Sequence, residues 1–308
     1  MLHNKYGVFI PTYNATRDLR YFQRNLEILQ QLSDNYQVLF IDSSSRDNTV
    51  DLIHQANFEC HVIPQAEFDH GKTRQLAAEI LSDCEVIIYL TQDAELTGID
   101  SIYALVAAFD DPLVATAFGR QLPHRDADVF AAANRAFNYP EQSYQRSYAD
   151  RVHYGVKCVF SSDSYAAYRR SVLFAVGGFP THVIVSEDML VTANMLKSGY
   201  KIAYVAKASC FHSHNYSLRQ EFSRYFDIGV FFAYETWIKQ EFGSAEGEGK
   251  KAILQQAKSL FKSQPWLLPS FVVRVLIRAL SYKLGVNYAK LPGSLVKKIS
   301  AQKQFWNK

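Results

Sequence analysis

Short apolar runs alternate with amphipathic stretches along the first ninety residues. The apolar runs are rich in β-branched and aromatic residues, which is typical of strands buried on both faces. They are YGVFI (6–10), YQVLFI (36–41), CHVI (60–63) and EVIIYL (85–90). The stretches between them place apolar side chains at helical spacing, over residues 18–32, 48–56 and 72–81. This alternation predicts an α/β fold with a mostly parallel sheet flanked by helices.

Polar residues follow three of these four predicted strands. Ligands of open α/β sheets bind beyond the carboxyl ends of the strands, so these residues are expected to line a binding site. They are Pro11, Thr12 and Tyr13 after the first strand, Asp42 and Ser44 after the second, and Gln92 and Asp93 after the fourth. The GxGxxG and GxxxxGK[ST] phosphate loops are both absent from the sequence, which disfavours a dinucleotide-binding or P-loop protein.

Composition favours a globular intracellular protein. Apolar residues make up 48% and charged residues 20% of 308 residues, enough for a buried core. The four cysteines lack CxxC or zinc-ligand spacing, which fits a reducing cytosol. The N-terminal apolar run is too short for a signal peptide or a membrane span, and no later stretch is long enough to cross a membrane.

The basic residues gather at the C-terminal end. Residues 249–308 hold 12 Lys or Arg and no acid, which leaves 21 basic and 30 acidic side chains in residues 1–248. We therefore expect a catalytic domain over residues 1–245 and a basic helical tail over residues 246–308.

The pattern of apolar and basic residues in the tail predicts an amphipathic helix over residues 271–284, with Arg274 and Arg278 one turn apart. Together with Lys297 and Lys298, this helix suits an in-plane position on the anionic inner leaflet of the cell membrane. Packing on the domain core, or against a second subunit of a homo-oligomer, is the alternative. Nucleic-acid binding is not expected, because no recognised module accompanies the basic residues.

Six motifs in order carry a resemblance to a known family. The strings are VFIPTYNATRDL, LFIDSSSRDNT, FDHGKTR, YLTQDA, VGGFP with SEDMLV, and SGYKIAYVAKASCFHSH. Read together over residues 6–235, they resemble family 2 inverting glycosyltransferases with the GT-A fold, and are most similar to bacterial rhamnosyltransferases. The resemblance implies transfer of L-rhamnose from dTDP-L-rhamnose to a polysaccharide acceptor, which the basic tail suggests is lipid-linked.

The resemblance also implies residues for the donor. Tyr13 would stack on the base and Asp42 would accept hydrogen bonds from base or ribose, although both also suit a local turn or helix cap. His70, Lys72 and Arg74 belong to a glycine-containing segment that opens a helix, whose N-terminus attracts anions. Arg74 would contact the diphosphate or the base. The alternative for Lys72 and Arg74 is a solvated helix face.

Asp93 occupies the place of the family's metal-binding acid. Its carboxylate would bridge Mg²⁺ or Mn²⁺ to the two phosphates of the donor. Gln92 and Ala94 flank this single aspartate, so the site departs from a D-x-D pattern. His212 or His214 could complete the site, and strand alternation favours only one of them facing the metal; packed histidines are the alternative.

Two adjacent acids are candidates for the catalytic base. Ser186 is expected to cap a helix that begins at Glu187 and Asp188 and ends before Gly199. By the resemblance, Asp188 takes the proton of the acceptor hydroxyl and Glu187 binds acceptor, or the two roles are exchanged. Gly178 and Phe179 would shape the floor of the acceptor pocket. Residues 119–154, weakly periodic and polar, are expected to contribute an acceptor-side lid.

Rival functions stay open at this point. The same enzyme class could use a UDP-hexose or a UDP-N-acetylhexosamine, because nothing in the residues excludes a 6-hydroxyl on the donor. A catalytically silent sugar-nucleotide or glycan-binding subunit is the rival from another class. A nucleotidyltransferase is disfavoured, because the expected glycine-rich basic phosphate loop is absent near the N-terminus.

Overall fold

The computed structural model describes residues 6–243 and 246–307, which divide into two compact units. The first unit comprises the described residues up to Ala149 together with Val159–Thr181 and Asp188–Ser213. The second comprises Asp150–Cys158, His182–Glu187 and the described residues from His214 onward. This grouping places residues 214–243 with the helical tail, whereas the sequence suggested a boundary at residue 245.

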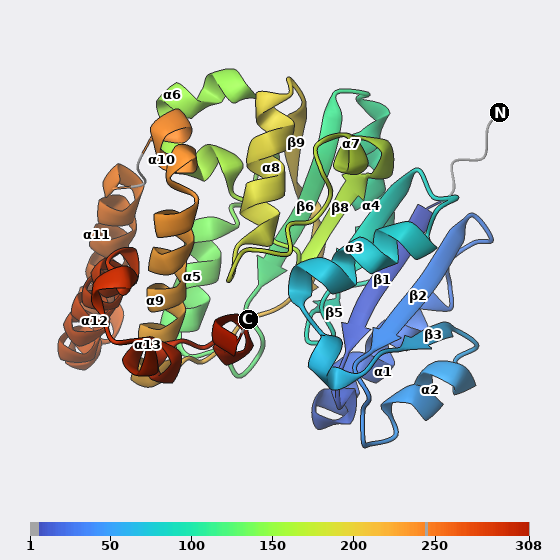
Figure 1. The fold of residues 1–308 in the computed structure, drawn as a ribbon, viewed down its shortest axis with the longest axis horizontal. Coiled ribbons are helices and arrows are strands. Elements are labelled where there is room, and N and C mark those ends of the chain that lie inside the picture. Colours follow the sequence, from blue (N-terminus) through green and yellow to red (C-terminus); the bar gives the residue numbers. More distant parts are fainter. Residues whose placement is uncertain (1–5, 244–245, 308) are drawn as a thin grey trace. The chain divides into compact units, whose positions relative to one another are not determined.

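A nine-stranded mixed sheet forms the first unit (Figure 1). Its order is β3-β2-β1-β4-β8-β6-β9-β5, with β7 paired to β9; β1 to β4 are parallel, as are β6 and β9. The strands are β1 (Tyr6–Thr12), β2 (Tyr36–Asp42), β3 (Glu59–Val62), β4 (Val86–Leu90), β5 (Glu95–Leu96), β6 (Val114–Leu122), β7 (Tyr144–Arg146), β8 (Tyr165–Arg169) and β9 (Lys201–Phe211). The predicted mixed, mostly parallel sheet is therefore confirmed.

Among the main helices of this unit, the first three and the one that begins at Glu187 were predicted from the sequence, whereas the other three were not. The helices are α1 (Leu19–Leu29), α2 (Thr49–Gln55), α3 (His70–Ile80), α4 (Ile99–Val106), α5 (Val129–Asn138), α7 (Arg170–Ala175) and α8 (Glu187–Lys197). The core joins the apolar face of α1, with Phe22 and Leu29, to Val8 and Ile10 of β1 and Phe40 of β2. Burial of these side chains drives the association of helix and sheet.

Three local expectations need correction. β3 is an edge strand with mostly exposed residues, not a strand buried on both faces, because only β2 pairs with it. Residues 119–154 are more regular than their weak periodicity indicated, since they contain the end of β6, α5, β7 and α6 (Arg151–Tyr154), and their role as an acceptor-side lid stays a prediction. Ser186 has a left-handed backbone, with φ of 64°, rather than the extended conformation of a usual N-cap.

The C-terminal end of α8 matches its sequence signal. Gly199 has φ of 87°, a conformation that favours glycine because it has no Cβ. The Gly199 amide donates to the Leu196 carbonyl at 3.0 Å, and the Tyr200 amide donates to the Met195 carbonyl at 3.1 Å. These two bonds form a Schellman motif, so the helix stops where the glycine predicted.

Helices dominate the second unit. They are α9 (Leu218–Tyr234), α10 (Thr236–Phe242), α11 (Glu246–Ser263), α12 (Leu268–Val286) and α13 (Gly293–Ile299), besides the short α6. Helices α9 and α12 pack tightly because glycines meet at their crossing. A Cβ added to Gly285 would lie 2.0 Å from the Phe226 carbonyl oxygen, and one added to Gly229 would lie 2.3 Å from that of Tyr282. Only glycine fits at these positions without moving a backbone.

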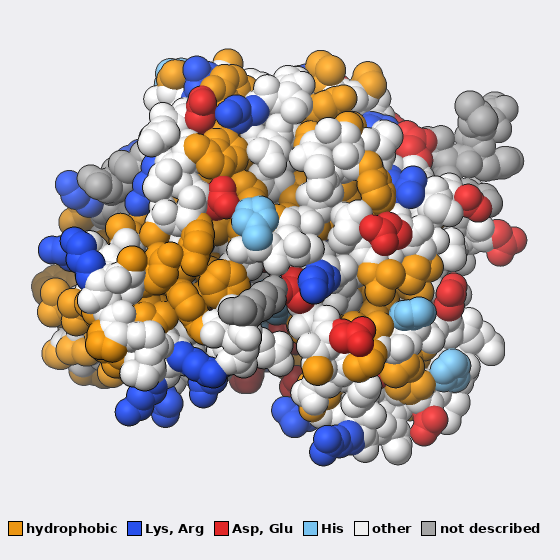
Figure 2. Space-filling view, viewed as in Figure 1, with side chains coloured by type: hydrophobic (Ala, Val, Ile, Leu, Met, Phe, Trp, Pro, Cys, Tyr) orange, Lys and Arg blue, Asp and Glu red, His pale blue; other side chains and the backbone are white. Residues whose placement is uncertain are grey.

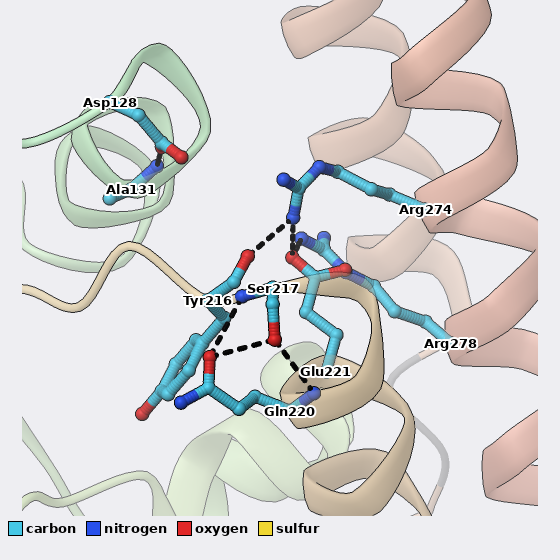
Figure 3. Close-up of polar contacts among 8 residues, drawn as sticks. All are labelled: Asp128, Ala131, Tyr216, Ser217, Gln220, Glu221, Arg274 and Arg278. Carbon is cyan, nitrogen blue, oxygen red and sulfur yellow. Dashed lines mark hydrogen bonds and ion pairs between the residues drawn. The ribbon is translucent and has the colours of Figure 1, made fainter.

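The two arginines of α12 point toward α9 (Figure 3). Arg274 and Arg278 each donate to the carboxylate of Glu221, at 2.6 and 2.8 Å. The Glu221 side chain is only 4% exposed. The expectation that these arginines face a membrane is therefore wrong, because both pair with a buried acid that precedes them by more than fifty residues. The alternative of a helix packed on protein describes this side of α12 correctly.

No helix in the described ranges combines the length and apolar character needed to cross a membrane.

Candidate functional site

Strand pairing brings Asp93 and His212 together at one end of the sheet. Asp93 lies in the connection from β4 to β5, and β5 pairs antiparallel with the end of β9, which His212 follows. The buried Asn25 of α1 fixes this connection, since its amide donates to the Ala94 carbonyl at 2.8 Å and its oxygen accepts from the Leu96 amide. An Asp93 carboxylate oxygen and the His212 Nε2 lie 3.6 Å apart.

Gln121 of β6 orients the imidazole of His212. β6 runs parallel to β9 in this region, and the Gln121 Oε1 lies 2.9 Å from the His212 Nδ1. An amide oxygen only accepts hydrogen bonds, so Nδ1 carries the proton and Nε2 presents its lone pair toward Asp93. Arg135 of α5 also donates to the Gln121 oxygen, and the Gln121 amide nitrogen donates to the Ser162 hydroxyl at 2.8 Å.

Electrostatics favour a neutral His212. Burial lowers the pKa of this imidazole below its ordinary value, and the neighbouring Asp93 carboxylate opposes that shift without reversing it. A neutral imidazole is the form that binds metal ions. The role of His212 as a metal ligand stays a prediction, and the neutral ring is the form that such a role requires.

The donor set of this cluster fits a divalent cation. Asp93, His212 and His214 each offer one ligand atom, and these atoms all lie within 4.8 Å of one another. Two ligands of a single ion with bonds of about 2.1 Å are roughly 3 to 3.5 Å apart, close to the separation of Asp93 and His212. The prediction that only one of the two histidines approaches the acid is not supported by this grouping.

A third histidine, His124, contacts the Asp93 backbone. The His124 Nε2 lies 3.2 Å from the Asp93 carbonyl oxygen, and its ring stacks on Tyr21 with centroids 4.5 Å apart. Neither His124 nor Tyr21 belongs to one of the six motifs, so the sequence did not indicate that they lie near Asp93. Their contribution is to hold the Asp93 backbone against α1.

Asp188 lies beside the connection that precedes β8. The amide of Asp163 donates to the Asp188 Oδ2 at 3.4 Å, and the Met189 amide donates to Oδ1 at 2.7 Å. The same connection is joined to the end of β4, because the Thr91 amide donates to the Ser164 carbonyl. It also contains Ser162, the partner of Gln121. Asp188 and the Asp93–His212 pair are thus linked through one short connection at the same end of the sheet.

Arg74 forms a buried ion pair with an acid that sequence reasoning missed. Its Nε lies 3.1 Å from the Asp163 Oδ2, with side chains only 8% and 2% exposed. The hydroxyl of Tyr168 donates to the other Asp163 oxygen at 2.5 Å, and that of Tyr89 donates to the Arg74 carbonyl. Arg74 is therefore neither a solvated surface residue nor a fully available cation. Nothing in the local sequence of Asp163 marks it as a partner of a residue 89 positions earlier.

The first strand end is held by Gln92. The Tyr13 amide donates to the Gln92 Oε1 at 2.8 Å, and the Gln92 Nε2 donates to the Tyr13 carbonyl at 3.2 Å. This reciprocal pair ties the ends of β1 and β4 together. Tyr13 is half-buried, while Pro11 and Thr12 lie within β1.

Asp42 is buried and bonded on both oxygens. It accepts from the Thr12 hydroxyl at 2.8 Å, and from the amide and hydroxyl of Ser45 at 2.7 and 2.6 Å. These are the contacts of the local turn that the sequence also allowed. Ser44 has φ of 59° and donates its hydroxyl to the Ile63 carbonyl. A contact of Asp42 with base or ribose remains a prediction.

The start of α3 keeps its polar residues at the surface. Asp69 caps the helix by accepting from the Lys72 amide at 3.1 Å, and the side chains of His70 and Lys72 are exposed. Gly71 allows the backbone to approach another segment closely. A Cβ there would lie 1.9 Å from the Pro180 carbonyl oxygen, so the glycine serves a contact within the protein.

Gly178 and Phe179 contact neighbours of the Arg74–Asp163 pair. The Phe179 amide donates to the Gln75 side chain, and the Phe179 ring meets the rings of Tyr89 and Tyr168 at 5.1 and 5.3 Å. Gly178 has φ of 74°, and a Cβ there would meet the Gln75 oxygen at 2.4 Å. An acceptor-binding role for these two residues remains a prediction. Glu187 precedes Asp188 as the first residue of α8.

Comparison with known proteins defines the class. Residues 7–176 match the model of the family described as glycosyl transferase family 2. The chain belongs to this family and is a glycosyltransferase, as the motifs predicted.

Two curated relatives share sequence similarity with the chain over nearly its whole length. The chain is 44% identical to the O-antigen chain rhamnosyltransferase RfbN of Salmonella typhimurium, over 98% of this chain and 96% of that protein. It is 41% identical to the O-antigen chain rhamnosyltransferase WbaN of Salmonella anatum, over the same shares. The predicted similarity to bacterial rhamnosyltransferases is confirmed.

Solved structures share the fold at low identity. The mannosyltransferase PcManGT from Pyrobaculum calidifontis, in complex with GDP-Man and Mn²⁺, superposes with a TM-score of 0.54 at 18% identity, covering 98% of this chain and 84% of that one. S. aureus TarS 1-349 in complex with UDP-GlcNAc gives 0.55 at 14% identity, with coverage of 96% and 84%. The GT-A fold predicted from the motifs is thereby confirmed.

Proposed function

We propose that this chain transfers L-rhamnose from dTDP-L-rhamnose to a hydroxyl of a lipid-linked O-antigen intermediate, with inversion at the anomeric carbon. The similarity over nearly the whole chain to two O-antigen rhamnosyltransferases carries this proposal. We place the reaction in the cytoplasm, at the inner face of the cell membrane, where a lipid-linked acceptor would be held.

The donor would bind at the ends of β1, β2 and β4. Tyr13 offers a half-buried ring to the thymine, at a backbone position that Gln92 holds. The exposed His70 and Lys72 lie at the N-terminus of α3, where the helix dipole favours the diphosphate. Arg74 would act through its ion pair with Asp163, which fixes its position before the donor arrives.

The acid–histidine cluster is the site proposed for the divalent ion. Asp93, His212 and His214 would hold it, and the bound ion supplies charge compensation for the departing dTDP. Imidazole donors suit Mn²⁺ better than Mg²⁺, which prefers oxygen ligands. We therefore propose Mn²⁺ as the preferred ion.

Asp188 is proposed as the base. The acceptor hydroxyl gives its proton to the Asp188 carboxylate while its oxygen forms a bond to C1 of rhamnose. The bond from C1 to the phosphate oxygen breaks on the opposite side, and dTDP leaves with the electron pair. Hydrogen bonds from the amides of Asp163 and Met189 hold the carboxylate in place.

A panel of donors tests the proposal. Purified protein is incubated with dTDP-L-rhamnose, UDP-glucose, UDP-galactose or UDP-N-acetylglucosamine, with a lipid-linked acceptor and Mn²⁺, and released nucleotide is measured. We expect release from dTDP-L-rhamnose alone. Release only from a UDP-sugar would overturn the rhamnose assignment, and release from none would favour a silent binding subunit.

Site variants test the residue roles. Asp188→Asn should lower kcat by at least about 100-fold with little change in donor KM, because the base acts only in the chemical step. Asp93→Asn should abolish Mn²⁺ binding measured by electron paramagnetic resonance, without substrates present. The exposed acid Asp34 provides a matched control, since Asp34→Asn should leave both measurements unchanged.

A further inference from the structure

The side of α12 that faces solvent is apolar. Val272, Leu276 and Leu280 are 52%, 63% and 56% exposed, and they recur at the spacing of one helix face. Val273 and Val286 border them and are also exposed. A helix that covers a soluble domain normally turns charged residues to solvent and apolar residues to the core. This helix does the reverse.

The inward side of α12 explains how the reversal is tolerated. Arg274 and Arg278 pair with the buried Glu221 (Figure 3). They lie opposite the apolar face by helical spacing, and Gly285 meets α9 at close range. The helix orientation is therefore set by a charge cluster and by a glycine contact. Rotating the helix to bury its leucines would leave Glu221 without these partners and would separate the glycines.

Neighbouring helices of the same unit extend the apolar face. On α11, Leu254 and Phe261 lie two turns apart and are 60% and 71% exposed, and Trp266 in the short link to α12 is 70% exposed. We call Leu254, Phe261, Trp266, Val272, Leu276 and Leu280 the apolar ridge. Figure 2 shows apolar side chains and Lys or Arg side chains next to one another at the left edge, where Figure 1 places α11 and α12. Large exposed apolar side chains in such number on neighbouring helices mark an interaction site.

The positive charge around the apolar ridge indicates an anionic partner. The ridge lies in the segment of residues 249–308, whose twelve basic side chains are unaccompanied by any acid. Two of them, Arg274 and Arg278, pair with the buried Glu221, so the basic side chains left to meet a partner are lysines. On α11, Lys258 and Lys262 are exposed beside Phe261. Apolar residues flanked by lysines, with a tryptophan between them, are typical of helices at the surface of an anionic bilayer.

We propose that the apolar ridge docks in the plane of an anionic lipid bilayer, with the lysines of α11 at the lipid phosphates. The ridge residues enter the boundary between headgroups and acyl chains, and no helix among the described residues spans the bilayer. The inference deepens the proposed function, because it names the surface through which the enzyme would meet a lipid-linked acceptor.

Vesicle binding tests the proposal without donor or acceptor, so its outcome is independent of the proposed transfer reaction. The full chain is co-sedimented with vesicles of phosphatidylcholine alone, or of phosphatidylcholine with one third phosphatidylglycerol. We expect binding to the anionic vesicles, weakened when salt is raised because the lysine attraction is screened. Equal or absent binding to both kinds of vesicle would overturn the proposal.

Variants locate the surface. Leu276→Ser with Leu280→Ser should weaken binding to anionic vesicles by at least about tenfold, because two apolar side chains no longer enter the bilayer. The matched control is Val62→Ser with Leu113→Ser, which removes two similarly exposed apolar side chains from the first unit. Lys258→Gln should weaken binding by about fivefold, whereas Lys207→Gln in the first unit should not.

Further measurements keep the outcomes distinct. Circular dichroism during unfolding checks the fold of every variant, and tryptophan fluorescence adds a check on the variants of the second unit, which contains all three tryptophans. Sedimentation without lipid checks self-association. If wild type is a dimer that Leu276→Ser with Leu280→Ser dissociates, while vesicle binding is unaffected, the ridge joins two copies of the chain and the membrane proposal is wrong.

Discussion

Each unit contains a buried cluster of arginine and carboxylate, but the two clusters have different consequences. In the first unit, Arg74 pairs with Asp163, whose amide also holds the candidate base Asp188. In the second, Glu221 pairs with Arg274 and Arg278 and sets the rotation of α12. One cluster supports a site, and the other turns an apolar face to solvent.

The difference teaches that a buried ion pair is best interpreted by what it orients. An isolated pair adds little net stability, because desolvation of the charges offsets their attraction, but removing one partner leaves an uncompensated buried charge. Both clusters should therefore be sensitive to single substitutions. Substitutions in the two clusters should destabilise different units, and only those in the first unit should also lower the transferase activity.

The largest effect on stability is expected for Glu221→Gln. It leaves two arginines without a neutralising acid and should destabilise the second unit by about 5 kcal/mol. All three tryptophans of the sequence, Trp237, Trp266 and Trp306, belong to this unit, so fluorescence reports its unfolding separately.

A triple variant provides the control for this prediction. Glu221→Leu with Arg274→Leu and Arg278→Leu removes all three charges and should recover most of the lost stability, because no buried charge remains. Unchanged unfolding of Glu221→Gln would contradict the importance of the cluster.

Asp163→Asn should have the next largest effect and should act on the first unit. Breaking the pair with Arg74 is expected to reduce stability by about 3 kcal/mol and to lower kcat as the support of Asp188 weakens. The loss should appear in circular dichroism, to which the sheet contributes, before tryptophan fluorescence changes. A variant with normal kcat would separate this pair from the candidate site.

Asp227 sharpens the comparison because it is a buried acid of the second unit with a raised pKa. Burial raises its pKa from the ordinary value of 3.8 to about 6, although it accepts from the Ala301 amide at 2.9 Å. The folded state therefore holds the proton more tightly than the unfolded state. The resulting stability is fully present below about pH 4 and is lost as pH rises through about 6.

Substitution by asparagine isolates this contribution. The difference in unfolding free energy between wild type and Asp227→Asn should change by at most about 3 kcal/mol between pH 4 and pH 7, in the direction of a relatively less stable wild type at pH 7. Tryptophan fluorescence during denaturant unfolding at each pH measures it. A constant difference across this range would show that the carboxyl does not titrate as described.

The smallest effect is expected for Gln121→Leu. The substitution removes the acceptor that fixes the His212 ring, so Mn²⁺ affinity should fall by roughly tenfold while the ligands themselves remain. Titration with Mn²⁺ in the absence of donor provides the measurement, and Gln121→Glu, which keeps an acceptor, should retain more affinity. Unaltered Mn²⁺ affinity in Gln121→Leu would contradict a positioning role for this residue.

Much of the fold and part of the candidate site follow from the sequence alone. The alternation of apolar runs and amphipathic stretches predicted the parallel strands and their helices, and Gly199 predicted the end of α8. Ordered motifs at strand ends predicted the family. They also singled out Asp93, the two candidate ligands His212 and His214, and the adjacent acids Glu187 and Asp188. The sequence reveals these features because each is a property of a short segment. Helix and strand periodicity, like the position of a residue directly after a strand, needs no knowledge of distant parts of the chain.

Tertiary structure alone decided the partners of these residues and the direction in which α12 faces. Gln121 beside His212, Asp163 beside Arg74, and Glu221 beside Arg274 are separated by 91, 89 and 53 positions. No short segment records such pairings. A helical pattern of arginines and leucines likewise fixes that two faces exist, but a buried acid elsewhere in the chain determines which of them turns inward.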